Sequence, residues 1–426
     1  GCGACILFDA NHASKMIDTN KGPIPQFNNK SKLTEEINDI CPSAKLNYPK
    51  LYKYHYGKYP NNWLIGEIKN IRTGFSSTPK IRQNSASGGI ITETLIYLLE
   101  QKIVDAVIIA KQGIPSPEKA RAYIATKKEE VLECSGSIYI PVSMLDILKE
   151  LDTKKKYAIT CLPEQSSALR AMQAKKYQPA LQIKFILGPY TGTSLYPKAI
   201  RTYLRSKKIK HNDQVKSLKW RAGKWPGYLE IKTKSGRIFR TPKVYYNYLI
   251  PFFITKTSLQ SMDFTNEFAD LSVGDAWSPM FEAEGGGHSV VVTRTKEMED
   301  IIQKMIKENI LNLKKTDPLK ASDMHGHMLD FKKRGSYIRN LFKKKFGIYA
   351  PDYGYRPAKI SLNRILIEIV IILIFFLGQT KIAHLLLEKC PEFLIGPFFN
   401  NLRLIWKKLS RPTKRKGLAE YEVKIN

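Results

Sequence analysis

The feature that most constrains the fold is an alternation of short apolar runs with amphipathic segments between about residues 80 and 310. Three apolar runs are typical of buried strands, namely 103–110, 157–162 and 181–187. Four segments with helical periodicity lie between or after them, namely 90–99, 165–175, 197–205 and 296–308. Residues 228–239 alternate about a Ser-Gly turn, which predicts an antiparallel hairpin. We therefore expect a mixed α/β (α+β) domain over residues 61–330, with a central mixed sheet and flanking helices.

Cysteines at the start of the chain point to a metal cofactor. Cys2 and Cys5 form a C-x-x-C pair, and Cys41 is followed by Pro42. Thiolates with this spacing can bind one inorganic core, and a distant Cys-Pro commonly completes the set. The pattern predicts an iron–sulfur cluster held by residues 1–60; a zinc site and structural or redox thiols are the alternatives. Because the chain begins with Gly, we expect the fourth ligand to lie about three residues before Cys2.

The charge of the chain indicates acidic partners. Lys and Arg number 69 against 38 Asp and Glu, which gives a formal net charge of +31. Nucleic acid, anionic lipid, a phosphorylated or acidic glycan precursor and an acidic electron carrier such as a ferredoxin would all fit, and compositional drift is the alternative. The basic residues are spread along the chain and form no recognisable nucleic-acid module, so we expect no specific nucleic-acid partner. The six cysteines show no disulfide-like spacing, which favours a reducing, cytoplasmic compartment.

The composition changes at about residue 330. Basic clusters alternate with aromatic residues at 331–334 and 342–346, and 365–377 is almost wholly apolar. A helix of that apolar length spans about 20 Å, short of the roughly 30 Å hydrocarbon core of a bilayer. Further apolar segments are followed by a basic run at 407–416. Residues 331–426 are thus predicted to form a basic, amphipathic helical extension on an anionic membrane surface, or else a helical subdomain packed on the core.

A small-residue loop before the predicted helix 90–99 resembles a phosphate cradle. It contains Arg82, Ser85, Ser87, Gly88 and Gly89. Glycines let backbone amides approach an anion, the helix N-terminus favours negative charge, and the arginine neutralises it. A helix start without any ligand is the alternative.

Two further segments carry polar residues at strand ends. Asp275 ends an apolar strand and is followed by Ala276 and Trp277, so its carboxylate is placed to bind a ligand or to cap the strand. His288 follows three glycines and is either an acid–base group or a structural histidine.

These segments occur in an order that resembles the beta subunit family of coenzyme F420 hydrogenase and formate dehydrogenase. The resemblance covers about residues 1–310 and rests on 1–5, 41–42, 82–89, 136–141, 162–170 and 267–277. It implies a flavoprotein that binds FAD and passes electrons between iron–sulfur clusters and an organic acceptor. Carried onto this chain, the resemblance places five residues in the FAD-binding region, with Asp275 near the flavin; the five are Arg82, Ser85, Ser87, Gly88 and Gly89.

The chain departs from that family at four positions where members commonly carry cysteine. It has Glu164, Thr191, Ser258 and Ser261 instead. Joint loss indicates that one whole cluster was abandoned, because a partial ligand set cannot hold one. One [4Fe-4S] cluster on Cys2, Cys5 and Cys41 is still expected. The pattern also resembles beta-subunit-like proteins that accompany polysaccharide assembly enzymes in bacteria.

The resulting hypothesis is a flavin-dependent iron–sulfur oxidoreductase, peripheral on the inner face of the cell membrane. It would pass electrons from a ferredoxin-like donor through one [4Fe-4S] cluster to FAD, and on to an unidentified organic acceptor in polysaccharide biosynthesis. The alternative is a non-redox scaffold that keeps the fold to bind a glycan or a protein partner.

Overall fold

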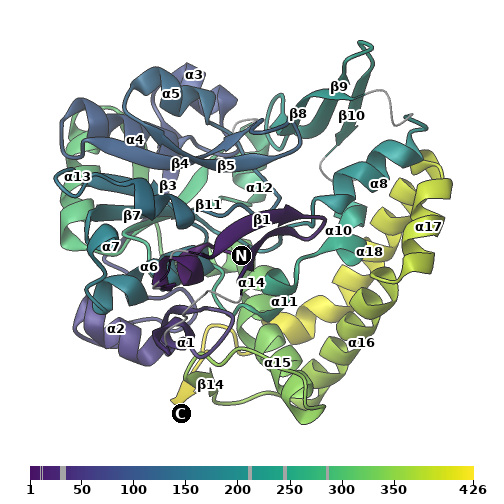
Figure 1. Ribbon diagram of the computed structural model, residues 1–426. Coiled ribbons are helices and arrows are strands. Elements are labelled where there is room, and N and C mark those ends of the chain that lie inside the picture. The colour runs from purple at the N-terminus through teal and green to yellow at the C-terminus, as the bar shows by residue number, and fades with distance from the viewer. Residues whose placement is uncertain (10, 12, 29–34, 210–213, 243–246, 285–286) are drawn as a thin grey trace.

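The structure, a computed structural model, describes the whole chain except residues 10, 12, 29–34, 210–213, 243–246 and 285–286 (Figure 1). Its centre is an eight-stranded sheet. In spatial order the strands are β13 (Leu311–Lys315), β3 (Asn70–Ser76), β12 (Ser289–Thr293), β11 (Leu271–Asp275), β7 (Ile183–Pro189), β6 (Tyr157–Thr160), β4 (Ala106–Gln112) and β5 (Ala120–Ala125). Strands β4, β6, β7 and β11 are parallel to one another, and the other pairs are antiparallel. The expected mixed sheet is confirmed.

Helices cover both faces of this sheet, which explains why its inner strands are continuously apolar. Successive residues of β4 point to opposite faces: Val107 and Ile109 belong to one core cluster, and Ile108 belongs to another. The first cluster includes α4 (Ile90–Glu100) and α13 (Lys296–Lys307). The second includes α2 (Tyr48–Tyr56) and α6 (Pro163–Ala174). The fold is therefore a layered α/β structure with two cores.

The predicted element bounds agree closely with the structure where the pattern is local. Helices α4, α6 and α13 lie within two residues of their expected limits, and α8 (Lys198–Ser206) begins one residue late. The expected hairpin is β9 (Tyr228–Thr233) paired with β10 (Ile238–Pro242), and β8 (Val215–Ala222) completes its small sheet. The third apolar run begins as a strand only at Ile183, because α7 (Gln178–Leu181) precedes it.

The remaining short elements connect these layers. At the start of the chain they are η1 (Ala4–Phe8), β1 (Lys15–Thr19), β2 (Gly22–Gln26) and α1 (Glu36–Ile40). In the middle they are α3 (Pro79–Asn84), α5 (Lys128–Glu133), η2 (Asp146–Glu150), η3 (Asn247–Leu249), α10 (Ile250–Phe253), α11 (Lys256–Gln260) and α12 (Pro279–Ala283). Ala4, Ile6 and Leu7 of η1 are buried in the same core cluster as α2 and α6. The N-terminal segment is thus packed on the sheet domain.

The C-terminal part of the chain is mainly helical. It consists of α14 (Pro318–Asp330), the π-helical turn η4 (Phe331–Gly335), α15 (Ser336–Lys345), β14 (Tyr355–Pro357), α16 (Leu362–Gly378), α17 (Lys381–Lys389), α18 (Glu392–Arg415) and β15 (Val423–Ile425). Figure 1 shows α16, α17 and α18 side by side along one edge of the molecule, and α16 contacts both of the others. Strand β15 returns to pair with β14.

The first basic cluster of this part differs from the surface cluster that its sequence suggests. Lys332, Lys333 and Arg334 are all buried. Lys333 forms an ion pair with Glu267, and Arg334 donates to Asp330 at 2.7 Å. The π-helical turn places three successive cations inside the protein, where Glu267 from a distant segment pairs with Lys333 and Asp330 from the preceding turn pairs with Arg334. This cluster contributes fold stability, not a basic surface.

Among the described residues, no single helix is long and apolar enough to cross a bilayer. The adjacent helices α16 and α17, bent by 70° relative to each other, pass that test of length and composition only as a pair.

Candidate functional site

A cavity of about 1900 Å³ opens at the carboxyl ends of the parallel strands. Its lining includes Cys161, Tyr190 and Asp275, which follow or end β6, β7 and β11. Open α/β sheets bind their ligands outside this edge, because the loops that follow the strands meet there. The volume exceeds the roughly 300–1,000 Å³ of an ordinary ligand pocket. The cavity can therefore hold more than one small molecule.

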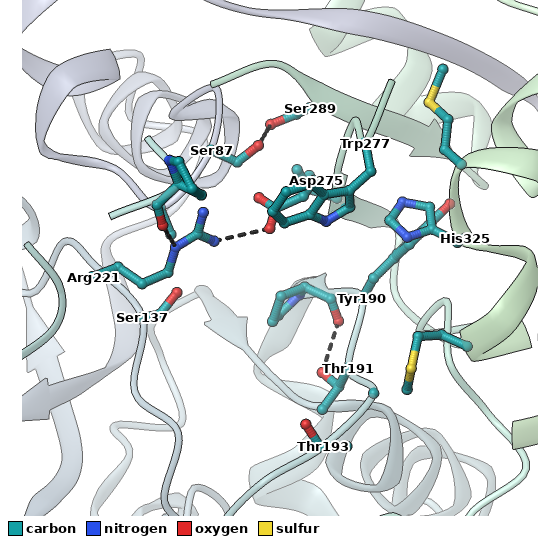
Figure 2. Close-up of a pocket in the computed structure, with 18 of the residues that line it drawn as sticks. Ser87, Ser137, Tyr190, Thr191, Thr193, Arg221, Asp275, Trp277, Ser289 and His325 are labelled. Carbon is teal, nitrogen blue, oxygen red and sulfur yellow. Dashed lines mark hydrogen bonds and ion pairs between the residues drawn. The ribbon is translucent and has the colours of Figure 1, made fainter. Parts of the chain in front are cut away.

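The small-residue loop that precedes α4 forms one wall of the cavity. The Ser87 hydroxyl donates to the His288 carbonyl at 2.7 Å, and the Ser289 hydroxyl donates to Ser87 Oγ at 3.0 Å. The Gly88 amide donates to Ser289 Oγ at 2.9 Å. Figure 2 shows the two serine hydroxyls facing each other above the cavity. These bonds attach the loop to the first residue of β12.

Two glycines permit this close contact between loop and sheet. A Cβ atom on Gly88 would lie 2.6 Å from the Gly74 carbonyl oxygen and 2.9 Å from Ser289 Oγ. A Cβ atom on Gly287 would lie 2.8 Å from the backbone of Ser87. Gly89 caps α4 in a left-handed conformation, with φ of +80°. Only glycines allow the loop and the strand to approach this closely.

The N-terminus of α4 and a nearby arginine make this wall suitable for an anion. Gly89, Ile90 and Ile91 line the cavity, and the N-cap residue has no side chain to accept their amide hydrogens. The Arg82 guanidinium stacks on the Phe75 ring at 3.5 Å, and its Nε donates to the Gly287 carbonyl. Arg82 itself does not line the cavity, but Phe75, on which it stacks, does. The wall therefore offers helix-terminal amides and close backbone approach, with a fixed cation next to it, which fits the pyrophosphate of a dinucleotide such as FAD.

Asp275 lies at the centre of the cavity and is held by an arginine from the small sheet. Arg221 of β8 forms an ion pair with Asp275 at 2.9 Å and donates from its Nε to the Pro226 carbonyl at 3.0 Å. Figure 2 shows Arg221 reaching toward Asp275. Trp277 packs on Trp225 with ring centroids 4.7 Å apart. The two sheets thus meet at this carboxylate.

A buried histidine lies near the same carboxylate. His325 of α14 packs against the rings of Tyr190 and Phe264, with centroids 5.2 Å and 5.3 Å away. Within the described parts of the chain, its Nε2 atom is buried without a hydrogen-bond partner. Burial lowers the pKa of His325 from 6.5 to about 4, although the charge of Asp275 acts to raise it. His325 is therefore a neutral imidazole at physiological pH.

We expect replacement of His325 by phenylalanine to reduce the acid sensitivity of the fold. Since the folded-state pKa lies below the unfolded value of 6.5, unfolding takes up a proton as the pH falls from 6.5 toward 4. The contribution of the neutral, buried His325 to the free energy of unfolding is fully present above pH 6.5 and is lost as the pH falls through this range. Between about pH 7.5 and pH 5, the natural protein should lose about 2 kcal/mol more free energy of unfolding than His325→Phe. Parallel urea-derived stability curves for the two proteins would contradict this assignment.

His288 has the contacts of a structural histidine. Its ring stacks on Phe281 at a centroid distance of 4.5 Å, and its Nε2 lies 3.1 Å from a carboxylate oxygen of Glu284. The side chain is buried, and its backbone carbonyl accepts the Ser87 hydroxyl. It therefore supports the loop wall.

The three candidate cluster ligands lie close together near the start of the chain. Burial is the largest cause that raises the pKa of Cys2, to about 12, and a charge on Cys41 raises it further. Burial and then Cys41 likewise raise the pKa of Cys5. The Cys2 carbonyl accepts from the Leu145 amide at 2.9 Å, which attaches this segment to η2. Among the described residues, however, no group of three His, Cys, Asp or Glu side chains is arranged to hold a metal ion.

Two of the four positions where the family resemblance leads one to expect further cysteines, Ser258 and Glu164, lie near a buried lysine. The Lys332 ammonium donates a hydrogen bond to the Ser258 carbonyl at 3.0 Å. Burial lowers the pKa of Lys332 to about 8, although the charge of Glu164 acts to raise it. The Ser261 carbonyl accepts from the Ser336 hydroxyl at 2.8 Å. The Thr191 amide donates to the Phe264 carbonyl at 2.8 Å. Hydrogen bonds and a cation from the C-terminal part thus occupy this region.

Sequence reasoning missed Arg221, His325 and the basic side of the cavity. Arg221 lies in the small sheet of the hairpin, 54 residues before its partner Asp275. His325 and the nearby His327 lie in a segment that matches no motif considered in the sequence. The basic residues of α18 that line the cavity were expected on a membrane surface, and only the packing of α18 beside α14 places them here.

The fold and this cavity define an α/β protein with a ligand site at the carboxyl edge of its sheet. Two family models match the chain, and they describe the N-terminal and C-terminal parts of the coenzyme F420 hydrogenase/dehydrogenase beta subunit. The first matches residues 71–149 and the second matches residues 154–318, so together they cover more than half of the chain. The chain belongs to the coenzyme F420 hydrogenase/dehydrogenase beta subunit family, as its sequence suggested, and is thus a member of an oxidoreductase family.

Individual relatives agree with this assignment. Coenzyme F420 hydrogenase subunit beta of Methanosarcina barkeri is 24% identical over 265 residues, covering 60% of this chain and 85% of its own length. The protein of the same name from Methanothermobacter thermautotrophicus is 22% identical over 300 residues, covering 68% and 99%. F420-dependent formate dehydrogenase 1 subunit beta of Methanococcus maripaludis is 29% identical over 124 residues, covering 29% and 32%.

A solved structure has the same fold. It is a chain of the F420-reducing [NiFe] hydrogenase complex of Methanosarcina barkeri, with a TM-score of 0.52 and 20% sequence identity. The match covers 66% of this chain and 95% of that chain.

Proposed function

We propose that this protein is a flavin-dependent oxidoreductase that binds FAD in the cavity at the carboxyl edge of the sheet. The observation that carries this proposal is the wall made by Ser85, Ser87, Gly89 and the first turn of α4. Gly88 packs this loop against the sheet, and Arg82 stacks on Phe75, which lines the same wall. FAD bound there would supply hydride and single-electron transfer to an organic acceptor. The names of the relatives, which include hydrogenase and formate dehydrogenase subunits, support the redox class.

The residues of the chain would position the cofactor and exclude water. The amides of Gly89 and Ile90 would hold the pyrophosphate, and Arg82, stacked on Phe75, would add positive charge nearby. Arg221 fixes the carboxylate of Asp275 in one orientation, so that it can accept a hydrogen bond from a ligand. Tyr190, whose pKa burial raises, supplies a largely apolar wall. Ser85 and Ser87 brace the loop through bonds to Ile81 and His288.

We further propose that Cys2, Cys5 and Cys41 are three ligands of one [4Fe-4S] cluster. Their spacing in the sequence supports this assignment, and the charge of Cys41 acts on the thiols of both Cys2 and Cys5. The described side chains are not arranged as a metal site, so the proposal requires the three thiols to move together when the cluster binds. A cluster there would supply single-electron transfer. The net charge of +31 suits an acidic, ferredoxin-like donor.

The site of action that we propose is the inner face of the cell membrane. Apolar side chains on α16, α17 and α18 face solvent, including Phe376 at 70%, Ile382 at 71% and Phe393 at 74% exposure. Lys381 of α17 and Lys408 of α18 are exposed on the same helices and would meet anionic head groups. An acceptor used in polysaccharide biosynthesis, where lipid-linked sugars are built, would be available at such a surface.

The alternative function is a non-redox scaffold that binds a glycan or a partner. The contacts of Lys332 in the region of the missing cysteines favour it, because they replace a redox group by structural bonds.

Electron delivery through the cysteine segment tests the redox proposal. Protein prepared anaerobically is mixed with reduced ferredoxin, and the loss of flavin absorbance is followed by stopped flow. The natural protein should be reduced, and Cys41→Ala should keep its FAD but react about tenfold more slowly or worse. Cys390→Ala, which changes a thiol on the C-terminal helices, is the matched control and should react normally. A flavin that ferredoxin does not reduce, or equal rates in all three proteins, would reject this route.

A further inference from the structure

A group of basic side chains on α14 and α18 lines the same cavity as the loop wall. The group, called here the basic wall, consists of His327, Lys407, Arg411, Lys414 and Arg415. The two helices contact each other, and Figure 1 shows α18 running beside α14. The family match ends at residue 318, so the C-terminal part of this chain supplies the basic wall. The cavity therefore has a part that family membership does not account for.

Two cations of the basic wall, Lys414 and Arg415, are held by contacts with neighbouring residues. Arg415 lies against α14 beside Gly326, whose added Cβ would be in ordinary contact with it, 3.4 Å from Arg415 Nε. Arg415 donates to the Asp323 carbonyl at 2.8 Å, and Lys414 lies 5.4 Å above the Trp406 ring. Within the part of the chain that the structure describes, Arg415 Nε is buried with no hydrogen-bond partner. The guanidinium thus retains donor capacity beside the cavity.

Carboxylates near the basic wall are too few to neutralise it. Asp323 lies 3.6 Å from Arg415 but is 79% exposed, and Glu282 acts on Lys407 from a distance. Burial is the largest cause that lowers the pKa of Lys407, and the charges of neighbouring arginines are the next largest. Burial also lowers the pKa of His327 to about 3, and neighbouring basic side chains lower it further. Asp330 and Glu368 also act on Lys414, but both already pair with buried arginines. This accumulation of positive charge would be relieved by a bound anion.

Apolar residues continue the cavity from the basic wall to the exposed face of the C-terminal helices. Ile374 of α16 and Leu402 of α18 line the cavity and are 42% and 49% exposed. Phe375 and Phe399 line it as well. One continuous surface therefore joins the loop wall, the basic wall and the apolar face. Its chemistry is complementary to an amphiphile with an anionic head.

We infer that the basic wall binds the phosphate or diphosphate group of the organic acceptor, whose reacting part reaches the cofactor beside Asp275. This inference rests on the proposed function, which it deepens by naming the substrate class. The phosphate can belong to a prenyl-type lipid carrier or to a soluble phosphorylated sugar. The apolar continuation favours the lipid carrier.

Calorimetric titration with two probes tests the basic wall. Inorganic pyrophosphate represents the head group alone, and farnesyl diphosphate below its aggregation concentration adds an apolar tail. In Lys407→Gln/Arg411→Gln, the affinity for pyrophosphate should fall about tenfold or more, because two charge-assisted contacts are lost. Lys216→Gln/Lys219→Gln removes the same charge from exposed positions of β8 outside the cavity lining, and it should bind normally. Equal losses in both variants, or no loss in either, would overturn the inference.

The comparison of the two probes identifies the source of the phosphate. Farnesyl diphosphate binding about tenfold tighter than pyrophosphate would indicate a lipid carrier, and equal affinities would indicate a soluble phosphorylated substrate. Both results support a phosphate site, and absence of binding by either probe contradicts it. FAD content is measured in the same samples. Pyrophosphate binding to a protein without flavin would reject the proposed function while leaving the anion site in place.

Discussion

Replacing Gly88 by alanine is expected to lower the affinity for FAD about 100-fold, or by about 2.7 kcal/mol. The added Cβ would lie 2.6 Å from the carbonyl oxygen of Gly74, a residue at the centre of β3 that pairs with β12 and β13. Because the sheet cannot move, the loop must withdraw, and the first amides of α4 move with it. Titration of the apoprotein with FAD, followed by flavin fluorescence, measures the loss.

The matched control is the same substitution at Gly236, in the turn between β9 and β10. This residue has a positive φ of +86°, and nothing lies within 4 Å of an added Cβ, so Gly236→Ala carries a local backbone cost without touching the cavity. It should bind FAD normally. Full FAD affinity in a folded Gly88→Ala protein would show that the loop is only a helix start.

The second large effect is expected at Lys333. Its ammonium and the Glu267 carboxylate are completely buried and form an ion pair, and Tyr52 donates a further hydrogen bond to that carboxylate. Lys333→Met would leave a buried carboxylate without its cation, which costs about 3–5 kcal/mol of unfolding free energy. Urea denaturation monitored by circular dichroism gives the value.

Two further variants separate charge pairing from packing at this position. Lys345→Met removes an exposed lysine of α15 and should change stability by less than about 0.5 kcal/mol. The double variant Lys333→Met/Glu267→Gln removes both charges and should recover most of the loss, because no unpaired charge remains. A Lys333→Met protein as stable as Lys345→Met would mean that water reaches Glu267.

The sequence predicted the parts of the fold that are determined locally. Helix periodicity located α4 and α13, and a turn glycine located the hairpin of β9 and β10. The order of strands in the large sheet depends on contacts such as β3 with β12, which are separated by more than 200 residues. Likewise, Lys333 looks like part of a surface cluster until Glu267, which is 66 residues away in the sequence, is placed beside it. Tertiary pairing therefore overrode the local pattern.

The candidate site was predictable to a similar extent. The segment from Ser85 to Gly89 combines its small residues and helix start within one short stretch, so its role as a cavity wall could be anticipated. Arg221 and His325 reach Asp275 from separate units of the fold, and their own neighbours in sequence give no sign of it. The basic wall needed the packing of two helices to become part of the cavity.

The most direct test of the flavoprotein assignment is the cofactor content of the protein prepared anaerobically. Its absorption spectrum is recorded, and FAD and iron are then quantified in the same sample. We predict about one FAD per chain, accompanied by about four iron atoms if the cysteine segment holds its cluster. FAD without iron would retain the flavin site and reject the cluster. A folded protein that carries no flavin and takes up none when FAD is added would contradict the central claim and leave the scaffold function in its place.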